Sequence, residues 1–249
     1  MYEGMIAESI RYEGDGGDLV DAYYARPLGP GPFPGVLVIH HNPGWDEATK
    51  EIARRFAVHG YAAISPHLFT REGAGTTNPQ DASAAARAAG GVPDARMLAD
   101  TDAALSYLRA QPYSNGKAGV IGYCSGGRQS YIVACNLAVD AAIVCYGGRI
   151  VVAAEDLTQA TPVPAIDMTP GLSCPLLGLF GVEDRNPSPE QVAIIEAELK
   201  ENGKDYEFHS YEDTGHSFFS VDRPAFRVES ANDGWARIFD FYAKHLAGS

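Results

Sequence analysis

The sequence predicts an α/β fold, built on a mostly parallel sheet of about eight strands with helices on both faces. Two observations predict it. Short apolar runs alternate along the chain with stretches of helical spacing, the order expected of a parallel sheet with crossover helices. The runs are also apolar throughout, as in strands that are buried on both faces. No internal repeat or low-complexity linker interrupts the chain, so we expect a single domain over residues 1–249.

The strands are expected in the following order. A hairpin comes first, with residues 6–12 and 19–25 on either side of the glycine-rich turn 13–17. Five apolar runs then predict buried strands, at residues 35–41, 61–65, 118–123, 141–146 and 176–181. The segment 206–211 is expected to be the last strand.

Helices are expected between these strands, at residues 46–59, 93–109, 126–137 and 189–203 and near the C-terminus from Trp235 to Leu246. Proline opens two of them, and Gly60 is a good stop for the first. Residues 70–92 and 149–173 fit no simple unit. Segments this long in a compact domain are usually lids or pocket walls, so we expect that role for both.

Composition excludes several classes of function. The net charge is −13 and no basic stripe is visible, which argues against nucleic-acid binding and against anionic membranes. No apolar stretch is long enough to span a bilayer, and residues 1–10 do not resemble a signal peptide. The four cysteines show no CxxC spacing, which disfavours a zinc or redox pair. We therefore expect a cytoplasmic protein that needs no metal.

A candidate nucleophile lies between a predicted strand and a predicted helix. Residues 122–126 read Gly-Tyr-Cys-Ser-Gly, which is the nucleophile-elbow pattern with Cys124 in the usual serine position. The helix N-terminus that follows favours a thiolate. Ser125 is the rival, but Tyr123 would then crowd the turn, so Cys124 is favoured.

The base and its acid follow from chain order, which in this arrangement is nucleophile, acid, histidine. Asp184 follows the apolar run 176–181, and His216 lies in the loop after the last strand. His216 would take the thiol proton and Asp184 would fix its tautomer. Glu183 is the competing acid, and Asp213 is interpreted as a loop former.

The remaining site residues are expected at strand ends. Backbone N–H groups of Ser125 and Asn42 would form the oxyanion hole, since Pro43 has no N–H to offer. Tyr123, beside the nucleophile, is expected to contact the substrate. His41 lies at the C-terminal end of a predicted strand, where catalytic groups collect in open α/β sheets, and it is a candidate substrate contact.

Several segments resemble the dienelactone hydrolase family (carboxymethylenebutenolidases). They are QPYSNGK at 111–117, GYCSGG at 122–127, EDTGHSF at 212–218 and YAAISP at 61–66. The resemblance runs from about residue 35 to the C-terminus. It implies a single-domain α/β-hydrolase with a Cys-His-Asp triad, no metal and no organic cofactor. The type reaction of the family opens an unsaturated, carboxylated lactone.

Two departures from the family pattern affect the substrate. Lactonases of this type carry a glutamate where this chain has His41, and they hold the substrate carboxylate with two arginines. Arg71 matches the first arginine, but Ser220 occupies the place of the second, with Arg223 nearby. We therefore expect an ester or lactone other than dienelactone. His41 either lies beside Cys124 and favours its thiolate, or only packs at the strand end.

The leading interpretation is thus a carboxylic ester or lactone hydrolase acting on a small molecule. Thioester or organophosphate cleavage on the same triad is an alternative. A weakly active binding protein that retains the fold is another, because fold alone does not establish activity. A monomer or small homo-oligomer is expected.

Overall fold

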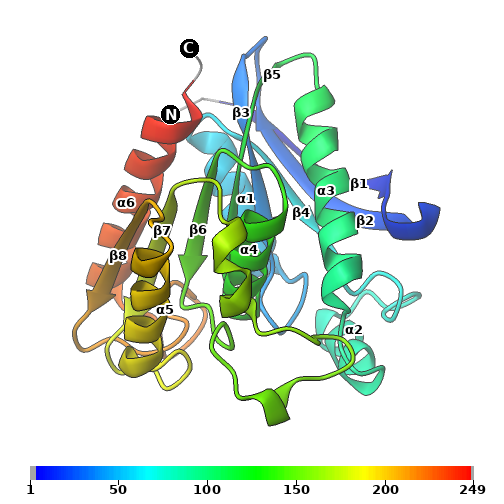
Figure 1. Cartoon of the computed structure of the whole chain (residues 1–249). Coiled ribbons are helices and arrows are strands. Elements are labelled where there is room, and N and C mark those ends of the chain that lie inside the picture. The colour runs from blue at the N-terminus through cyan, green and yellow to red at the C-terminus, as the bar shows by residue number, and fades with distance from the viewer. Residues whose placement is uncertain (1–3, 248–249) are drawn as a thin grey trace. The chain divides into compact units, whose positions relative to one another are not determined.

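The computed structural model describes residues 4–247, in which strands and helices alternate as the sequence predicts (Figure 1). The strands are β1 (Met5–Glu13), β2 (Leu19–Pro27), β3 (Phe33–Ile39), β4 (Ala62–Pro66), β5 (Ser114–Tyr123), β6 (Ala141–Cys145), β7 (Leu176–Gly181) and β8 (Tyr206–Tyr211). The α-helices are α1 (Glu47–Val58), α2 (Pro79–Ala88), α3 (Asp94–Ala110), α4 (Ser125–Asn136), α5 (Pro189–Glu201) and α6 (Val228–Leu246). Short 3-10 helices are η1 (Asp15–Gly17), η2 (Ala154–Asp156) and η3 (Ala165–Gly171).

The eight strands form one sheet in the order β1-β2-β4-β3-β5-β6-β7-β8. The predicted α/β fold with a mostly parallel sheet is confirmed. By their internal contacts, the described residues divide into two compact units, 4–119 with 158–162 and 120–157 with 163–247. The single domain expected from the sequence stays a prediction.

The first unit holds the antiparallel edge of the sheet. Strand β1 pairs with β2 as the expected hairpin, β2 pairs antiparallel with β4, and β3 pairs parallel with β4. Val36, Leu37, Val38 and Ile39 of β3 are at most 1% exposed, as an apolar run between two helix layers requires. Helix α3 lies in front of these strands and α1 behind them (Figure 1).

The second unit contains parallel strands only, with β6 paired to β7 and β7 to β8. Helix α4 packs on β6, and α6 packs on β6 and β7. Helix α5 begins with a capping box, in which Ser188 and Gln191 exchange hydrogen bonds ahead of the first turn. These strands end where the candidate site residues lie, in the loops after β5, β7 and β8.

The expectation that residues 70–92 form no regular element was wrong, because helix α2 forms inside this segment; a role of the segment as a lid or pocket wall stays a prediction. Asn78 caps the helix by accepting from the Gln80 N–H, and Pro79 occupies its first turn. An asparagine followed by proline and an alanine-rich stretch was therefore the signal that predicts this helix. Residues 149–173 do remain irregular apart from η2 and η3. Over residues 4–247, no helix is long and apolar enough to cross a membrane.

Candidate active site

Cys124 occupies a strained turn between β5 and α4. Its backbone has φ 57° and ψ −119°, a region that a residue with a side chain rarely adopts. A Cβ on Gly122 would lie 1.9 Å from the carbonyl oxygen of Gly126, so the turn closes only with glycine before it. Ser125 is already the first residue of α4. The elbow is therefore centred on Cys124 and not on its rival Ser125.

Cys124 also differs from the other three cysteines in exposure. Its side chain is partly accessible, whereas Cys135, Cys145 and Cys174 are buried. Burial raises the pKa of Cys135 and of Cys174 to about 12, and that of Cys145 well above its ordinary value. These three thiols therefore stay protonated and inert, and Cys124 is the thiol that chemistry can use.

His216 is hydrogen-bonded to a buried carboxylate. Its Nδ1 lies 2.7 Å from Oδ2 of Asp184, whose side chain is 3% exposed. The competing acid, Glu183, is exposed and its N–H bonds the Thr214 carbonyl. Asp213 has φ 52°, as a loop former does, and its carbonyl accepts a bond from Arg227. The acid that meets the histidine is thus Asp184.

His216 also interacts with Cys124. Burial alone would lower the pKa of His216, but hydrogen bonds with Asp184 and Cys124, together with their charges, raise it to about 9. The imidazole is therefore protonated near neutral pH. Protonated histidine next to Cys124 is the arrangement that stabilises a thiolate. Cys124, His216 and Asp184 all belong to the second unit.

Sequence reasoning missed Tyr146, which follows β6. Its ring centroid lies 5.0 Å from that of His216 at 63°, an edge-on contact. Its hydroxyl is hydrogen-bonded to Ser220, and Arg223 lies close enough for its charge to act on the phenol. Tyr146 has φ 39°. A tyrosine at a strand end, followed by Gly147-Gly148, was the signal available in the sequence.

Asn186 was missed as well. Its N–H donates to Oδ1 of Asp184 at 2.9 Å, so both carboxylate oxygens of Asp184 are held. Its side-chain oxygen accepts from the N–H of Arg149 at 3.1 Å, and Arg149 has φ 62°. Asn186 therefore ties the acid loop to the strained loop that carries Tyr146. An asparagine two residues after the acid is a turn-forming pattern that predicts such bonding.

With this geometry established, comparison with known proteins identifies the family. The model of the dienelactone hydrolase family matches residues 20–246. The chain belongs to the dienelactone hydrolase family. It is 31% identical over 244 residues to a carboxymethylenebutenolidase of Pseudomonas putida, covering 96% of this chain and 97% of that protein. A proposed carboxymethylenebutenolidase of Methylorubrum extorquens is 32% identical over 244 residues, with 97% and 82% covered.

A solved structure agrees. A proposed dienelactone hydrolase from Klebsiella pneumoniae superposes with a TM-score of 0.88 at 29% identity, covering 98% of this chain and all of that one. The resemblance inferred from the sequence is confirmed, and so is the α/β-hydrolase fold. The chain is a hydrolase of the dienelactone hydrolase type.

His41 departs from the dienelactone hydrolase pattern, and its side chain is hydrogen-bonded to a carboxylate of the same unit. Its Nε2 lies 2.6 Å from Oδ2 of Asp46, the residue that caps α1. Burial of Asp46 opposes its ionisation, but the bonds from His41 and Thr49 lower its pKa to about 2. This pairing supports the interpretation of His41 as a residue that packs at the strand end. A role in activating Cys124 stays a prediction.

Arg71 corresponds to the first of the two arginines that hold the substrate carboxylate in the family, but here its guanidinium is paired with acidic side chains of the protein. Its guanidinium bonds Asp18 at 2.8 Å and Asp100 at 2.8 and 3.0 Å, and also donates to the Asp15 carbonyl. The Asp100 side chain is fully buried. If Arg71 bound a substrate carboxylate instead, the buried Asp100 carboxylate would lose its counter-ion, which costs free energy. These contacts favour a structural role for Arg71, and substrate binding by Arg71 stays a prediction.

The two other predicted residues are placed more simply. Tyr123 is 4% exposed and packs among Tyr146, Phe219 and Trp235. The Asn42 carbonyl accepts a bond from Ser83 at 2.6 Å. Substrate contact by Tyr123 and an oxyanion role for the Asn42 N–H stay predictions.

Proposed function

We propose that this hydrolase cleaves a carboxylic ester or lactone through a covalent acyl-enzyme on Cys124. One observation supports the proposal most strongly. His216 interacts with Asp184 through Nδ1 and with Cys124, while Cys124 occupies the strained turn at the start of α4. Nucleophile, base and orienting acid are then in the relation that acyl transfer requires.

The proposed reaction runs in two halves. The Cys124 sulfur attacks the carbonyl carbon, and its proton resides on Nε2 of His216, because Nδ1 is bonded to Asp184. The carbonyl oxygen becomes an oxyanion, for which the Ser125 N–H at the start of α4 is a donor free of intrahelical bonding. The carbon–oxygen bond then breaks, and His216 gives its proton to the leaving oxygen.

In the second half, water attacks the thioester and gives a proton to His216. The carbon–sulfur bond breaks, and the acid and the resting Cys124–His216 pair are restored. With a lactone, the leaving oxygen stays on the acyl group, so a hydroxy or oxo acid is released.

Hydrolysis of p-nitrophenyl acetate by the wild type and Cys124→Ala tests the proposal. We expect turnover in the wild type, a burst of one nitrophenol per chain, and loss of both in the variant. One equivalent of iodoacetamide should abolish turnover and label Cys124. Labelling of Cys135, Cys145 or Cys174 instead, or equal rates in both proteins, would overturn the proposal and favour a binding protein that retains the fold.

A further inference from the structure

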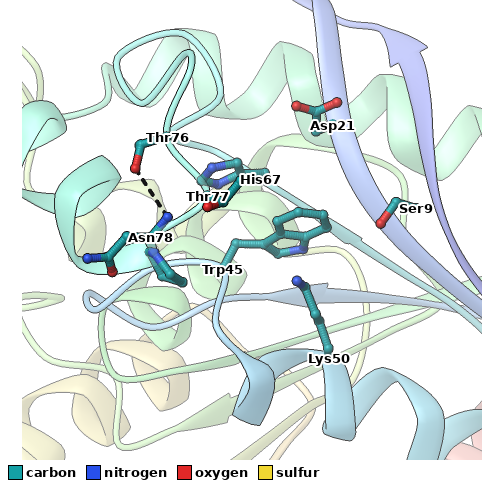
Figure 2. A pocket seen from close by; sticks show the side chains of 9 residues that line it. Ser9, Asp21, Trp45, Lys50, His67, Thr76, Thr77 and Asn78 are labelled. Atoms are coloured by element: carbon teal, nitrogen blue, oxygen red, sulfur yellow. Dashed lines mark hydrogen bonds between the residues drawn. The ribbon is translucent and has the colours of Figure 1, made fainter.

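The first unit contains a cavity that shares no residue with the candidate triad. It has a volume of about 310 Å³. Its lining residues come from β1, β2, the loop before α1, α1 itself, the position after β4, and the loop that leads into α2. That volume is at the lower end of small-molecule sites, so the cavity suits a ligand of few atoms. Trp45, Lys50, His67 and Thr76 are among its lining residues, and Figure 2 shows how they lie.

Lys50 supplies the charge of the cavity. Its ammonium lies 4.2 Å from the centroid of the Trp45 ring, a cation–π contact that holds it in place. In the part of the chain that the structure describes, Lys50 forms no ion pair with a carboxylate. Asp21 also lines the cavity, but Arg11 pairs with it at 2.6 Å. Lys50 is thus a positive charge in the cavity that has no carboxylate partner. Such a cation stands out in a chain whose net charge is −13.

Trp45 and His67 form a fixed wall. Their rings are stacked, with centroids 5.1 Å apart and planes at 12°. The indole N–H of Trp45 donates to the Ser65 carbonyl at 3.0 Å, which fixes the ring. His67 is 9% exposed, and its Nδ1 has no hydrogen-bond partner among residues 4–247.

The facing loop adds hydrogen-bond donors. The Thr76 hydroxyl accepts from the Asn78 N–H at 3.1 Å, as the dashed line in Figure 2 marks, and keeps its own proton to donate. Thr77 and Ser9 add two more hydroxyl-bearing residues to the lining, and Asn78 also lines it, with its side-chain oxygen bound by the Gln80 N–H. Donors around one uncompensated cation suit a ligand with several acceptor oxygens and a negative charge.

We propose that this cavity binds a small organic carboxylate, with its oxygens on Lys50 and on the donors of the loop 76–78. The ammonium provides the counter-charge, and the Trp45–His67 wall contacts the carbon skeleton. A carboxylate is also the class of product that ester or lactone hydrolysis releases. That last link rests on the proposed function, whereas the binding site itself does not.

Proton–nitrogen NMR of the full chain tests the proposal, because Trp45 and Trp235 give two indole N–H signals and Trp45→Phe identifies the one that reports on the cavity. Acetate, succinate, benzoate and inorganic phosphate are titrated at constant ionic strength. We expect at least one carboxylate to shift the Trp45 signal saturably and leave Trp235 in place. Lys50→Gln should weaken its affinity at least tenfold, and Lys50→Arg should retain it.

Lys200→Gln removes the same charge from the exposed face of α5 and should leave the affinity unchanged. The absence of any saturable shift, equal affinity in Lys50→Gln, or saturation by phosphate alone would each overturn the proposal. Should Lys50→Gln fail to fold, loss of binding in Thr77→Val serves the same purpose. Repeating the titration with Cys124→Ala separates this proposal from the proposed function, since binding must survive when turnover is gone.

Discussion

At the scale of single residues, the candidate triad depends on which carboxylate meets His216. Asp184 is buried and bonds Nδ1 of His216, whereas the neighbouring Glu183 points to solvent. An acid that fixes the tautomer of a histidine acts through geometry as well as charge. The two adjacent carboxylates are therefore a matched pair for testing the assignment.

We expect Asp184→Asn to keep the fold and lower kcat roughly 10²–10⁴-fold, because an amide at this position favours the wrong tautomer. Glu183→Gln, the isosteric change one residue away, should stay within about twofold of the wild type. Steady-state kinetics on p-nitrophenyl acetate measure both. An inactive Glu183→Gln beside a normal Asp184→Asn would mean that the acid is Glu183.

The raised pKa of His216 predicts a pH dependence of stability. The folded protein binds a proton on His216 more tightly than the unfolded chain does, since the pKa of His216 rises from 6.5 to about 9. The resulting stabilisation is complete at pH values below the pKa of His216 in the unfolded chain. It is lost as the pH rises through the pKa of His216 in the folded protein. The melting temperature should therefore fall between about pH 7 and about pH 10.

His216→Gln provides the control for this fall. Tyrosines and lysines titrate in the same pH range in both proteins, so the difference between the two curves reports on His216 together with Cys124, to which it is hydrogen-bonded. In thermal melts, we expect the difference in melting temperature between the wild type and His216→Gln to become smaller toward high pH. Parallel curves would show that His216 gains no proton affinity on folding.

At the scale of elements, Arg71 holds the β1–β2 hairpin region against helix α3. Asp18 and Asp15 lie at the hairpin turn and Asp100 in α3, and the guanidinium bonds all three residues. The N–H of Asp15 also donates to Asp100 at 2.8 Å. Arg71 therefore acts as a structural tie between two parts of the first unit.

Arg71→Ala should destabilise the protein by about 3–5 kcal/mol, because it leaves the fully buried Asp100 carboxylate unpaired. Arg11→Ala, which removes an exposed ion pair, should leave the stability nearly unchanged. Urea unfolding measures both. If Arg71→Ala keeps its stability and instead raises KM for acidic esters only, Arg71 binds substrate as the sequence suggested.

The loop between β6 and η2 depends on Asn186. Tyr146 and Arg149 both adopt left-handed backbone, which costs energy that surrounding contacts must offset. Asn186→Ala removes one such contact, worth about 1 kcal/mol, and leaves the backbone bond to Asp184. We expect kcat to fall about three- to tenfold with KM nearly unchanged, and the pH profile of kcat to shift.

Asn202→Ala, at the end of α5, is the matched control and should leave kcat and its pH profile unchanged. A purely structural role for Asn186 would lower the melting temperature without moving the pH profile. That outcome would exclude a catalytic effect of the Asn186 side chain through the loop that carries Tyr146 and Arg149.

At the scale of the whole molecule, the net charge of −13 should govern encounter with charged substrates. An anionic ester is repelled at long range, and salt screens this repulsion over about 10 Å at 0.1 M. We expect kcat/KM for an anionic ester to rise with ionic strength, and kcat/KM for an uncharged ester of the same size to stay constant. A fall for the anionic ester would indicate local attraction by a cationic site that outweighs the net charge.

The sequence by itself determined the order of the strands and of the α-helices other than α2, and it predicted the elbow at Cys124 with a candidate acid and base. These follow from local signals: a strained turn that needs Gly122, apolar runs whose ends carry polar residues, and a fixed chain order of triad members. Helix α2 is the exception, although its signal is local too, namely the Asn78-Pro79 cap ahead of an alanine-rich stretch. Such features depend on neighbours within a few residues, so one chain is enough to predict them.

Only the tertiary structure decided what the long polar side chains do. Arg71 meets Asp18 and Asp100, which lie 53 and 29 residues away, and the sequence offers no means of choosing these acids over a substrate. The contacts of Tyr146, Asn186 and Lys50 were likewise beyond reach, as was the cavity beside Trp45. Pairing between distant side chains depends on how elements pack, and packing is a property of the folded chain that local sequence does not encode.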